Sequence, residues 1–193
     1  METALSIALG IALSAAAGFR VFVPLLALSI GGYTDVVHLT PGFAWIGTIP
    51  SMIAFGTATI AEVGAYYVPW VDNALDTIAA PAAVIAGTVI SASVITDLPP
   101  LVRWSLALMG GGGIAGILQG ATAFLRLKSS TFTAGLGNPA LATMELGGSV
   151  ITVILGILVP AVAAGIMALL AIGIFLVARR LLFSRPARQV KRG

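Results

Sequence analysis

Six long apolar runs constrain this chain more than any other feature of its sequence. A bilayer core about 30 Å thick is crossed by about 20 apolar residues in a helix. Helices satisfy every backbone amide within one segment, so they are the structure that such runs predict in lipid. The sequence therefore predicts an all-α, polytopic membrane bundle with about six spans. The runs are residues 4–32, 44–70, 78–95, 104–125, 141–159 and 161–177.

Charged residues are too few for an ordinary soluble domain. They make up 9% of the 193 residues, whereas 59% are hydrophobic, and a typical soluble domain carries about 25% charged residues. The chain has no cysteine and one histidine. This composition excludes disulfides and thiolate metal sites, so we expect no metal and no cofactor. No nucleophile lies beside a base at a recognisable spacing, and we expect no enzyme.

Basic residues gather near the end of the chain and predict its orientation. Six of the ten Lys and Arg residues lie within residues 179–193, and Arg126 and Lys128 fall on the same side of a six-span bundle. The positive-inside rule then places both termini in the cytoplasm and residues 96–100 outside the cell. We expect residues 184–193 to form a basic cytoplasmic tail that contacts anionic lipid. The tail has no aromatic residue for base stacking, so we expect no nucleic-acid binding.

The two halves of the chain resemble each other, which predicts an internal repeat. An arginine, a glutamate and a proline follow one another in the same order in residues 1–100 and in residues 101–183. A unit of three spans must reverse its orientation in the second copy, so the sequence predicts an inverted three-helix repeat, an architecture typical of transporters. The alternative is that Ala- and Gly-rich helices resemble one another by composition alone. The matched residues are Arg20 with Arg126, Glu62 with Glu145, and Pro81 with Pro160.

Each half also has a segment that does not fit one simple span. Residues 4–32 would make a helix about 43 Å long, against a hydrocarbon core of about 30 Å. In the second half, residues 129–139 are polar and rich in glycine. We therefore expect in each half a helix that ends near its arginine, a short re-entrant or broken segment, and a hairpin of two helices. An ordinary loop is the alternative for residues 129–139.

Small residues recur at every fourth position in the first helix of each half. Such stripes let helices approach one another closely, and they lead us to expect a homodimer. The four consecutive glycines at 110–113 indicate a tight helix crossing, which we favour, or a hinge. The stripes are Ser6, Gly10, Ser14 and Gly18 in the first half, and Gly112, Gly116 and Gly120 in the second.

Ionisable side chains inside the predicted spans are the candidates for function, because each costs about 2.5–3.5 kcal/mol to insert into lipid. In a transporter the arginines would attract the solute, and the glutamates would orient the arginines or take up protons. As a structural clamp, the same pairs would only hold helices together. A further alternative is that the side chains of Arg126 and Lys128 extend to the lipid headgroups. The candidate substrate-binding or pathway residues are Arg20, Glu62, Arg126, Lys128, Asn138 and Glu145.

A family resemblance rests on three segments: residues 17–24, which read Ala-Gly-Phe-Arg-Val-Phe-Val-Pro, the segment around Glu62, and the turn Gly137-Asn138-Pro139. In these segments the chain resembles a family of small bacterial inner-membrane proteins that is classed as a domain of unknown function. The resemblance extends over nearly the whole chain. It implies a location in a bacterial plasma membrane, and it assigns no functional residue.

These features predict a small integral membrane transporter or channel for a small polar or anionic solute. The alternative is a non-transporting membrane scaffold or assembly protein that intramembrane Arg/Glu pairs stabilise. The expected partners are the lipid bilayer, a small solute and further copies of the chain.

Overall fold

A computed structural model describes the backbone of residues 2–183 and their side chains, except those of residues 69, 70, 72–74, 76, 182 and 183. Every regular element in this range is a helix, as predicted for an all-α chain. The predicted basic tail, residues 184–193, lies outside the described residues. The elements are α1 Glu2–Ala17, α2 Phe22–Tyr33, η1 Pro41–Gly47, α3 Ile49–Ala65, α4 Pro69–Val94, α5 Pro100–Leu106, η2 Ala107–Gly112, α6 Gly113–Thr133, α7 Asn138–Leu158 and α8 Pro160–Phe183.

Four helical stretches among the described residues are long and apolar enough to cross a membrane. They lie in α4, in the continuous run from α5 to α6, in α7 and in α8. η1 and α3 are bent by 63° relative to each other and make a fifth crossing if they act as one broken span. α1 and α2 are shorter apolar helices of 16 and 12 residues. The chain is a helical membrane protein, and its described helices give four or five crossings by length instead of the six expected.

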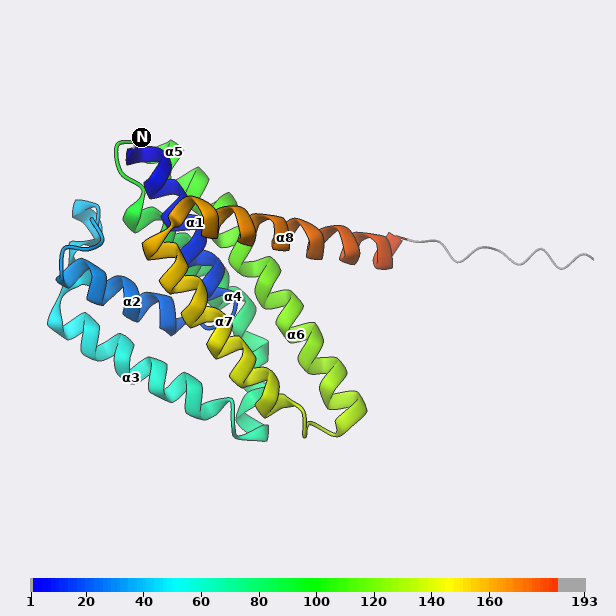
Figure 1. Cartoon of the computed structure of the whole chain (residues 1–193). Coiled ribbons are helices and arrows are strands. Elements are labelled where there is room, and N and C mark those ends of the chain that lie inside the picture. The colour runs from blue at the N-terminus through cyan, green and yellow to red at the C-terminus, as the bar shows by residue number, and fades with distance from the viewer. Residues whose placement is uncertain (1, 184–193) are drawn as a thin grey trace, which may run out of the picture.

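α1 and α2 form a broken pair that enters the bundle and returns to the end from which it came (Figure 1). Near the start of α1, the Ser6 hydroxyl accepts a hydrogen bond from the Thr96 backbone N–H, 3.4 Å away. Beyond α2, the Thr40 N–H donates to the Ser93 carbonyl oxygen over 2.8 Å. Both outer ends of the pair therefore lie beside the C-terminal end of α4. The structure confirms a helix that ends near its arginine and a break after it in the first half, and a re-entrant path through the membrane stays a prediction.

The break between α1 and α2 has a local cause in Pro24. This residue has no N–H to donate to the Arg20 carbonyl, and its ring would clash with that carbonyl in a continuous helix. α1 therefore ends at Ala17, and α2 begins at Phe22 with the proline in its first turn. Gly18 allows a close approach here, because a Cβ at this position would lie 2.7 Å from the Ala115 carbonyl oxygen.

The broken pair changes the predicted topology. The N-terminus and residues 96–100 lie at the same end of the bundle, and the turn between α6 and α7 lies at the other end (Figure 1). Six simple spans would place the N-terminus and residues 96–100 on opposite sides of the membrane. That expectation is wrong because it counts residues 4–32 as one crossing, whereas α1 and α2 turn back inside the bundle.

The second half contains no matching break. The helical run that starts at Pro100 continues past Arg126 to Thr133, and a turn at residues 134–137 leads directly into α7. The polar residues at the end of α6 fit a helix because their hydroxyls bond to carbonyls one turn earlier, as Thr133 Oγ1 does to Ser129 O over 2.7 Å. Residues 129–139 are thus a helix end and an ordinary turn, not a re-entrant segment. The inverted repeat, with its units 1–100 and 101–183, stays a prediction.

The glycine-rich segment forms a tight crossing, as favoured from the sequence. η2 is a π-helical turn that packs against α4. A Cβ at Gly111 would lie 2.5 Å from the Gly87 carbonyl oxygen. The same carbonyl accepts a hydrogen bond from the Ser14 hydroxyl of α1 over 2.7 Å. Small residues therefore bring the backbones of α1, α4 and η2 together in the core. Ser14 and Ser91 are fully buried there.

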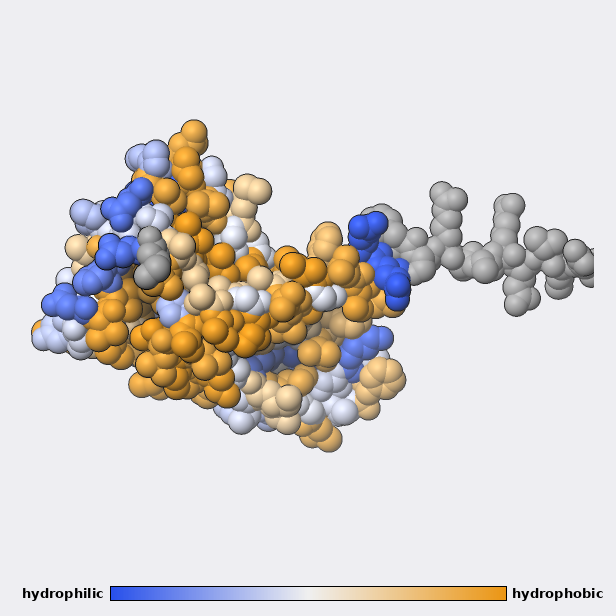
Figure 2. Space-filling model, turned by 45° about the horizontal axis from the view of Figure 1, so that its top comes forward, coloured by the Kyte–Doolittle hydropathy of each residue, from blue (hydrophilic) through white to orange (hydrophobic). Residues whose placement is uncertain are grey.

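α8 projects from the bundle, and its apolar side chains remain uncovered along most of its length (Figure 1). Figure 2 shows hydrophobic residues along this helix and over the adjoining face of the bundle. Apolar surface on this scale is expected where lipid surrounds a protein. From residue 169 onward, the exposed large residues of α8 include Leu169, Leu170, Ile172, Phe175, Leu176, Val177 and Leu181.

Candidate functional site

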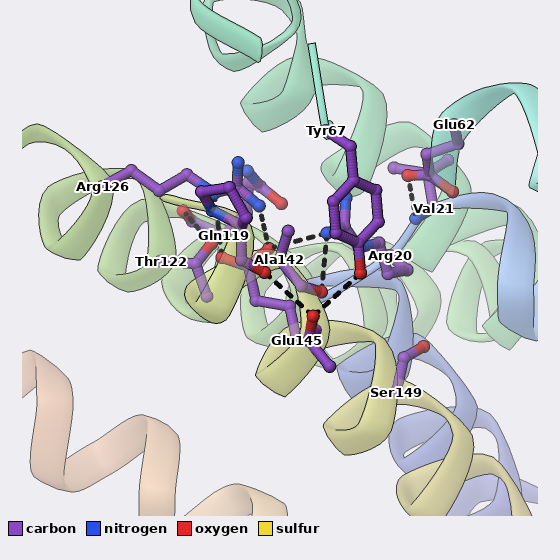
Figure 3. A network of polar contacts seen from close by, with 12 residues as sticks. Arg20, Val21, Glu62, Tyr67, Gln119, Thr122, Arg126, Ala142, Glu145 and Ser149 are labelled. Atoms are coloured by element: carbon purple, nitrogen blue, oxygen red, sulfur yellow. Dashed lines mark hydrogen bonds and ion pairs between the residues drawn. The ribbon is translucent and has the colours of Figure 1, made fainter. Parts of the chain in front are cut away.

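Arg20 lies in the break between α1 and α2, and its guanidinium group is buried inside the bundle (Figure 3). Only 2% of the residue is exposed. Its Nη2 donates to the Ala142 carbonyl oxygen over 2.9 Å and lies 3.3 Å from Oε2 of Glu145. Both partners belong to α7, and Glu145 lies two turns, about 10 Å, from the start of that helix. The break therefore holds a cation well inside the bundle.

Arg126, on α6, meets the same carboxylate from another side. Its Nε donates to Oε1 of Glu145 over 3.0 Å, and its Nη2 donates to Oε2. Such two-pronged pairs fix geometry as well as charge. Arg126 is 2% and Glu145 8% exposed, so the alternative that Arg126 reaches the headgroups is wrong. One carboxylate thus serves two arginines.

Tyr66, the first residue after α3, supports both cations with its ring. The Cζ atom of Arg20 lies 3.8 Å from the ring centroid, and that of Arg126 lies 4.1 Å from it. An aromatic face attracts a guanidinium group, most strongly where water is excluded. Tyr66 is 6% exposed. The ring and Glu145 together let two like charges lie near each other in the interior.

Glu62, on α3, does not form the predicted ion pair with Arg20 among the described contacts. Its Oε1 accepts from the Val21 N–H over 2.9 Å, and its Oε2 accepts from the Phe22 N–H over 3.0 Å. The first N–H groups of a helix have no partner within it, and a carboxylate there also faces the positive end of the helix dipole. Two equivalent Arg/Glu pairs are therefore not formed: Glu62 caps α2, and Arg20 turns to Glu145.

Arg20 also keeps hydrogen-bonding capacity that the described residues do not use. Its Nε and Nη1 are buried and have no hydrogen-bond acceptor among the groups that the structure describes. A guanidinium group carries five N–H donors and cannot lose its charge in a protein. Buried donors without acceptors are costly. Two guanidinium donors of Arg20 are therefore left without an acceptor among the described residues.

The other two predicted pathway residues lie away from this cluster. Lys128 is exposed, with its Nζ 5.5 Å from the Phe124 ring centroid. Asn138 is buried at the start of α7, where its Nδ2 donates to the Ser130 hydroxyl over 3.1 Å and ties the turn between α6 and α7. The structure therefore brings together Arg20, Glu62, Arg126 and Glu145, and leaves these two outside.

Sequence reasoning missed Tyr66 and the polar faces of α6 and α7. Tyr66 follows Glu62 by four residues, which puts both on one side of the chain as α3 ends. On α6, Gln119 and Thr122 are buried on the face of Arg126 (Figure 3). On α7, Ser149 is buried one turn beyond Glu145 and donates to the Ala16 carbonyl oxygen over 3.0 Å. Polar residues at helical spacing around each ion were the available signal.

Comparison with known proteins now places the chain in a family. A family model described as Domain of unknown function (DUF4126) matches residues 7–180. The chain belongs to the DUF4126 family. The match confirms the expected resemblance to a domain of unknown function, and the matched range contains Arg20, Glu62, Arg126 and Glu145. No curated protein and no solved structure matches the chain.

Within the described part of this DUF4126 chain, no three His, Cys, Asp or Glu side chains gather as ligands for a metal ion. The cluster instead offers guanidinium N–H groups and, at the start of α2, backbone N–H groups held by Glu62. These are donors, and donors with positive charge recognise anions.

Proposed function

We propose that the chain is a small membrane transporter or channel for a small polar or anionic solute, with Arg20 as the residue that attracts it. The observation that carries this proposal is the buried Arg20 side chain, which lies in a broken helix pair and has two nitrogens without an acceptor among the described groups. Broken backbone inside a membrane bundle is tolerated where protein or a water-filled cavity satisfies it. Transporters place such breaks at their solute sites.

The charge pattern supports the same proposal. Ionisable groups within membrane segments are costly and commonly mark a solute or ion pathway. Arg126 is paired with Glu145 on two atoms, whereas Arg20 shares that carboxylate over 3.3 Å. The weaker pairing leaves Arg20 as the group with charge and donors to spare.

A scaffold or assembly protein is the second candidate function. It is favoured by the bonds through which Glu145, Arg126 and Arg20 tie α7 to α6 and to the break after α1. In that case an Arg126→Glu variant would lose its fold, and Glu145→Arg added to it would restore the fold without any solute being moved. We further propose a location in a bacterial plasma membrane, assembly into a homo-oligomer and the absence of enzymatic activity.

Flux into proteoliposomes tests the transport proposal. A panel of small anions and polar solutes would be offered with and without a pH gradient to the wild type, Arg20→Ala and Arg180→Gln, a control at the far end of α8. We expect flux of at least one solute, reduced in Arg20→Ala by about tenfold or more, because a charge-assisted hydrogen bond is worth about 1.5–3 kcal/mol. The control variant keeps wild-type flux. Normal flux in a folded Arg20→Ala protein would contradict the assignment.

A further inference from the structure

The described ions of the buried cluster are two arginines and two glutamates. Arg20 and Arg126 contribute two positive charges, and Glu62 and Glu145 contribute two negative charges. Charges in a protein interior interact strongly because the surroundings screen them little. An anion placed beside a carboxylate of the cluster would therefore be repelled by it.

The two carboxylates of the cluster differ in their hydrogen-bond partners. Both oxygens of Glu145 are bonded to guanidinium groups. Both oxygens of Glu62 accept only from the neutral N–H groups of Val21 and Phe22. The charged groups that act on Glu62 are Arg20, in the break before α2, and Glu145 on α7. Glu62 is thus the carboxylate whose charge is least tied to a cation.

An anion on Arg20 would lie close to Glu62. The free donors Nε and Nη1 belong to the residue that directly precedes the N–H groups capped by Glu62. One anion bound there would repel the negative charge of the Glu62 carboxylate. One proton would cancel that charge, and Glu62 is the group that can take it without breaking an Arg–Glu pair.

We propose that the cluster binds one small monovalent anion at Arg20 together with one proton at Glu62. This inference rests on the transport function proposed above and names its solute class and its coupling ion. The proton bonds to one carboxylate oxygen of Glu62, which becomes a hydroxyl donor and releases the N–H of Val21 or Phe22. That N–H, at the positive end of α2, then becomes available to the anion beside the Arg20 guanidinium. Anion and proton thus favour each other's binding.

The test measures anion binding as a function of pH in nanodiscs, with chloride, nitrate and formate as probes and gluconate as the background anion. Anion affinity follows from the stabilisation of the protein against thermal unfolding. Above the pH at which Glu62 protonates, linkage of one proton makes the wild-type Kd rise about tenfold per pH unit. Glu62→Gln, which mimics the protonated side chain, binds the same anion with one Kd at every pH. Glu2→Gln, a carboxylate change at the exposed N-terminus, behaves as the wild type.

A second measurement needs no variant. When an anion that binds is added to wild-type protein in weakly buffered solution, the protein should take up one proton for each anion bound. Binding without proton uptake, a pH-independent wild-type Kd, or no stabilisation by any of the three probes would overturn the inference. The transport proposal would survive any of these results if proteoliposomes still moved a solute, and it fails only if the flux panel is silent.

Discussion

At the residue scale, Glu145 holds the cluster together. It is the only carboxylate among the described residues that contacts both Arg20 and Arg126, and all three side chains are largely buried. Removing one partner of a buried ion pair leaves an uncompensated charge, which costs far more than the pair contributes as a whole. The cluster should therefore respond sharply to a change at this position.

Replacing Glu145 by alanine should lower the free energy of unfolding by about 3–5 kcal/mol, the cost of a broken buried pair. Denaturant titration in detergent micelles measures this change. Glu2→Ala serves as the matched control, and its effect should stay within about 0.5 kcal/mol, as for other surface positions. Equal effects of the two substitutions would mean that Glu145 carries no ionic contact in the folded protein.

Substitutions at Tyr66 separate what the aromatic ring contributes to stability from what the size of the side chain contributes. Tyr66→Leu removes the face on which both guanidinium groups lie, and each such contact is worth about 0.5–2 kcal/mol. Tyr66→Phe keeps the ring and should be clearly the more stable of the two variants in the same denaturant titration. If leucine and phenylalanine were equivalent here, the ring would act only as an apolar filler.

The sequence predicted the ions of the site but not how they pair. Arg20, Arg126, Glu62 and Glu145 were found because charge is rare in lipid. Their partners follow from three-dimensional facts: Pro24 creates a free helix N-terminus, and that terminus takes Glu62 away from Arg20. Lys128 and Asn138 were expected in the pathway, but one is exposed and the other stabilises a turn.

At the element scale, the crossing of α4 with η2 depends on the absence of side chains. A Cβ at Gly111 would lie 2.5 Å from the Gly87 carbonyl oxygen, and a Cβ at Gly87 would lie 2.7 Å from the Ala115 Cβ. Backbone atoms cannot yield by a side-chain rotation, so the helices would have to separate. The rearrangement would reach α1 through the Ser14 hydroxyl, which donates to the same carbonyl.

Gly111→Ala should lower the free energy of unfolding by about 1–3 kcal/mol, the range for overpacking a tight core. Gly120→Ala is the control, because a Cβ there meets nothing within 4 Å. In a helix interior that change should be neutral or stabilising, by up to about 1 kcal/mol. A Gly111→Ala protein as stable as Gly120→Ala would show that the crossing is looser than described.

The broken helix pair of the first half could be predicted from the sequence. The continuous helix of the second half could not. The first apolar run is too long for one span and contains Pro24, so a break near Arg20 could be expected. In the second half, polar and glycine-rich residues suggested the same break, but hydroxyls such as that of Thr133 bond back into the helix and let α6 continue. Polar composition alone does not distinguish these two outcomes.

At the scale of the whole molecule, the path of the chain predicts which segments share a side of the membrane. The start of α1 lies beside the loop before α5, and the turn between α6 and α7 lies at the far end (Figure 1). The chain has no cysteine, so single cysteines can be introduced without a background. A membrane-impermeant maleimide should label Glu2→Cys and Pro99→Cys from one side of the membrane and Leu136→Cys from the other. Labelling of positions 2 and 99 from opposite sides would contradict the re-entrant pair.

The most direct test of the account follows proton and charge movement together in proteoliposomes that face an inward nitrate gradient. Co-transport of one anion with one proton carries no net charge, so the lumen should acidify without an electrical current, and the acidification should vanish in Arg20→Ala. A nitrate current without acidification would contradict the role of Glu62 as a proton carrier and indicate a simple anion channel. Neither current nor acidification, from folded wild-type protein that binds nitrate, would contradict transport itself and favour the scaffold.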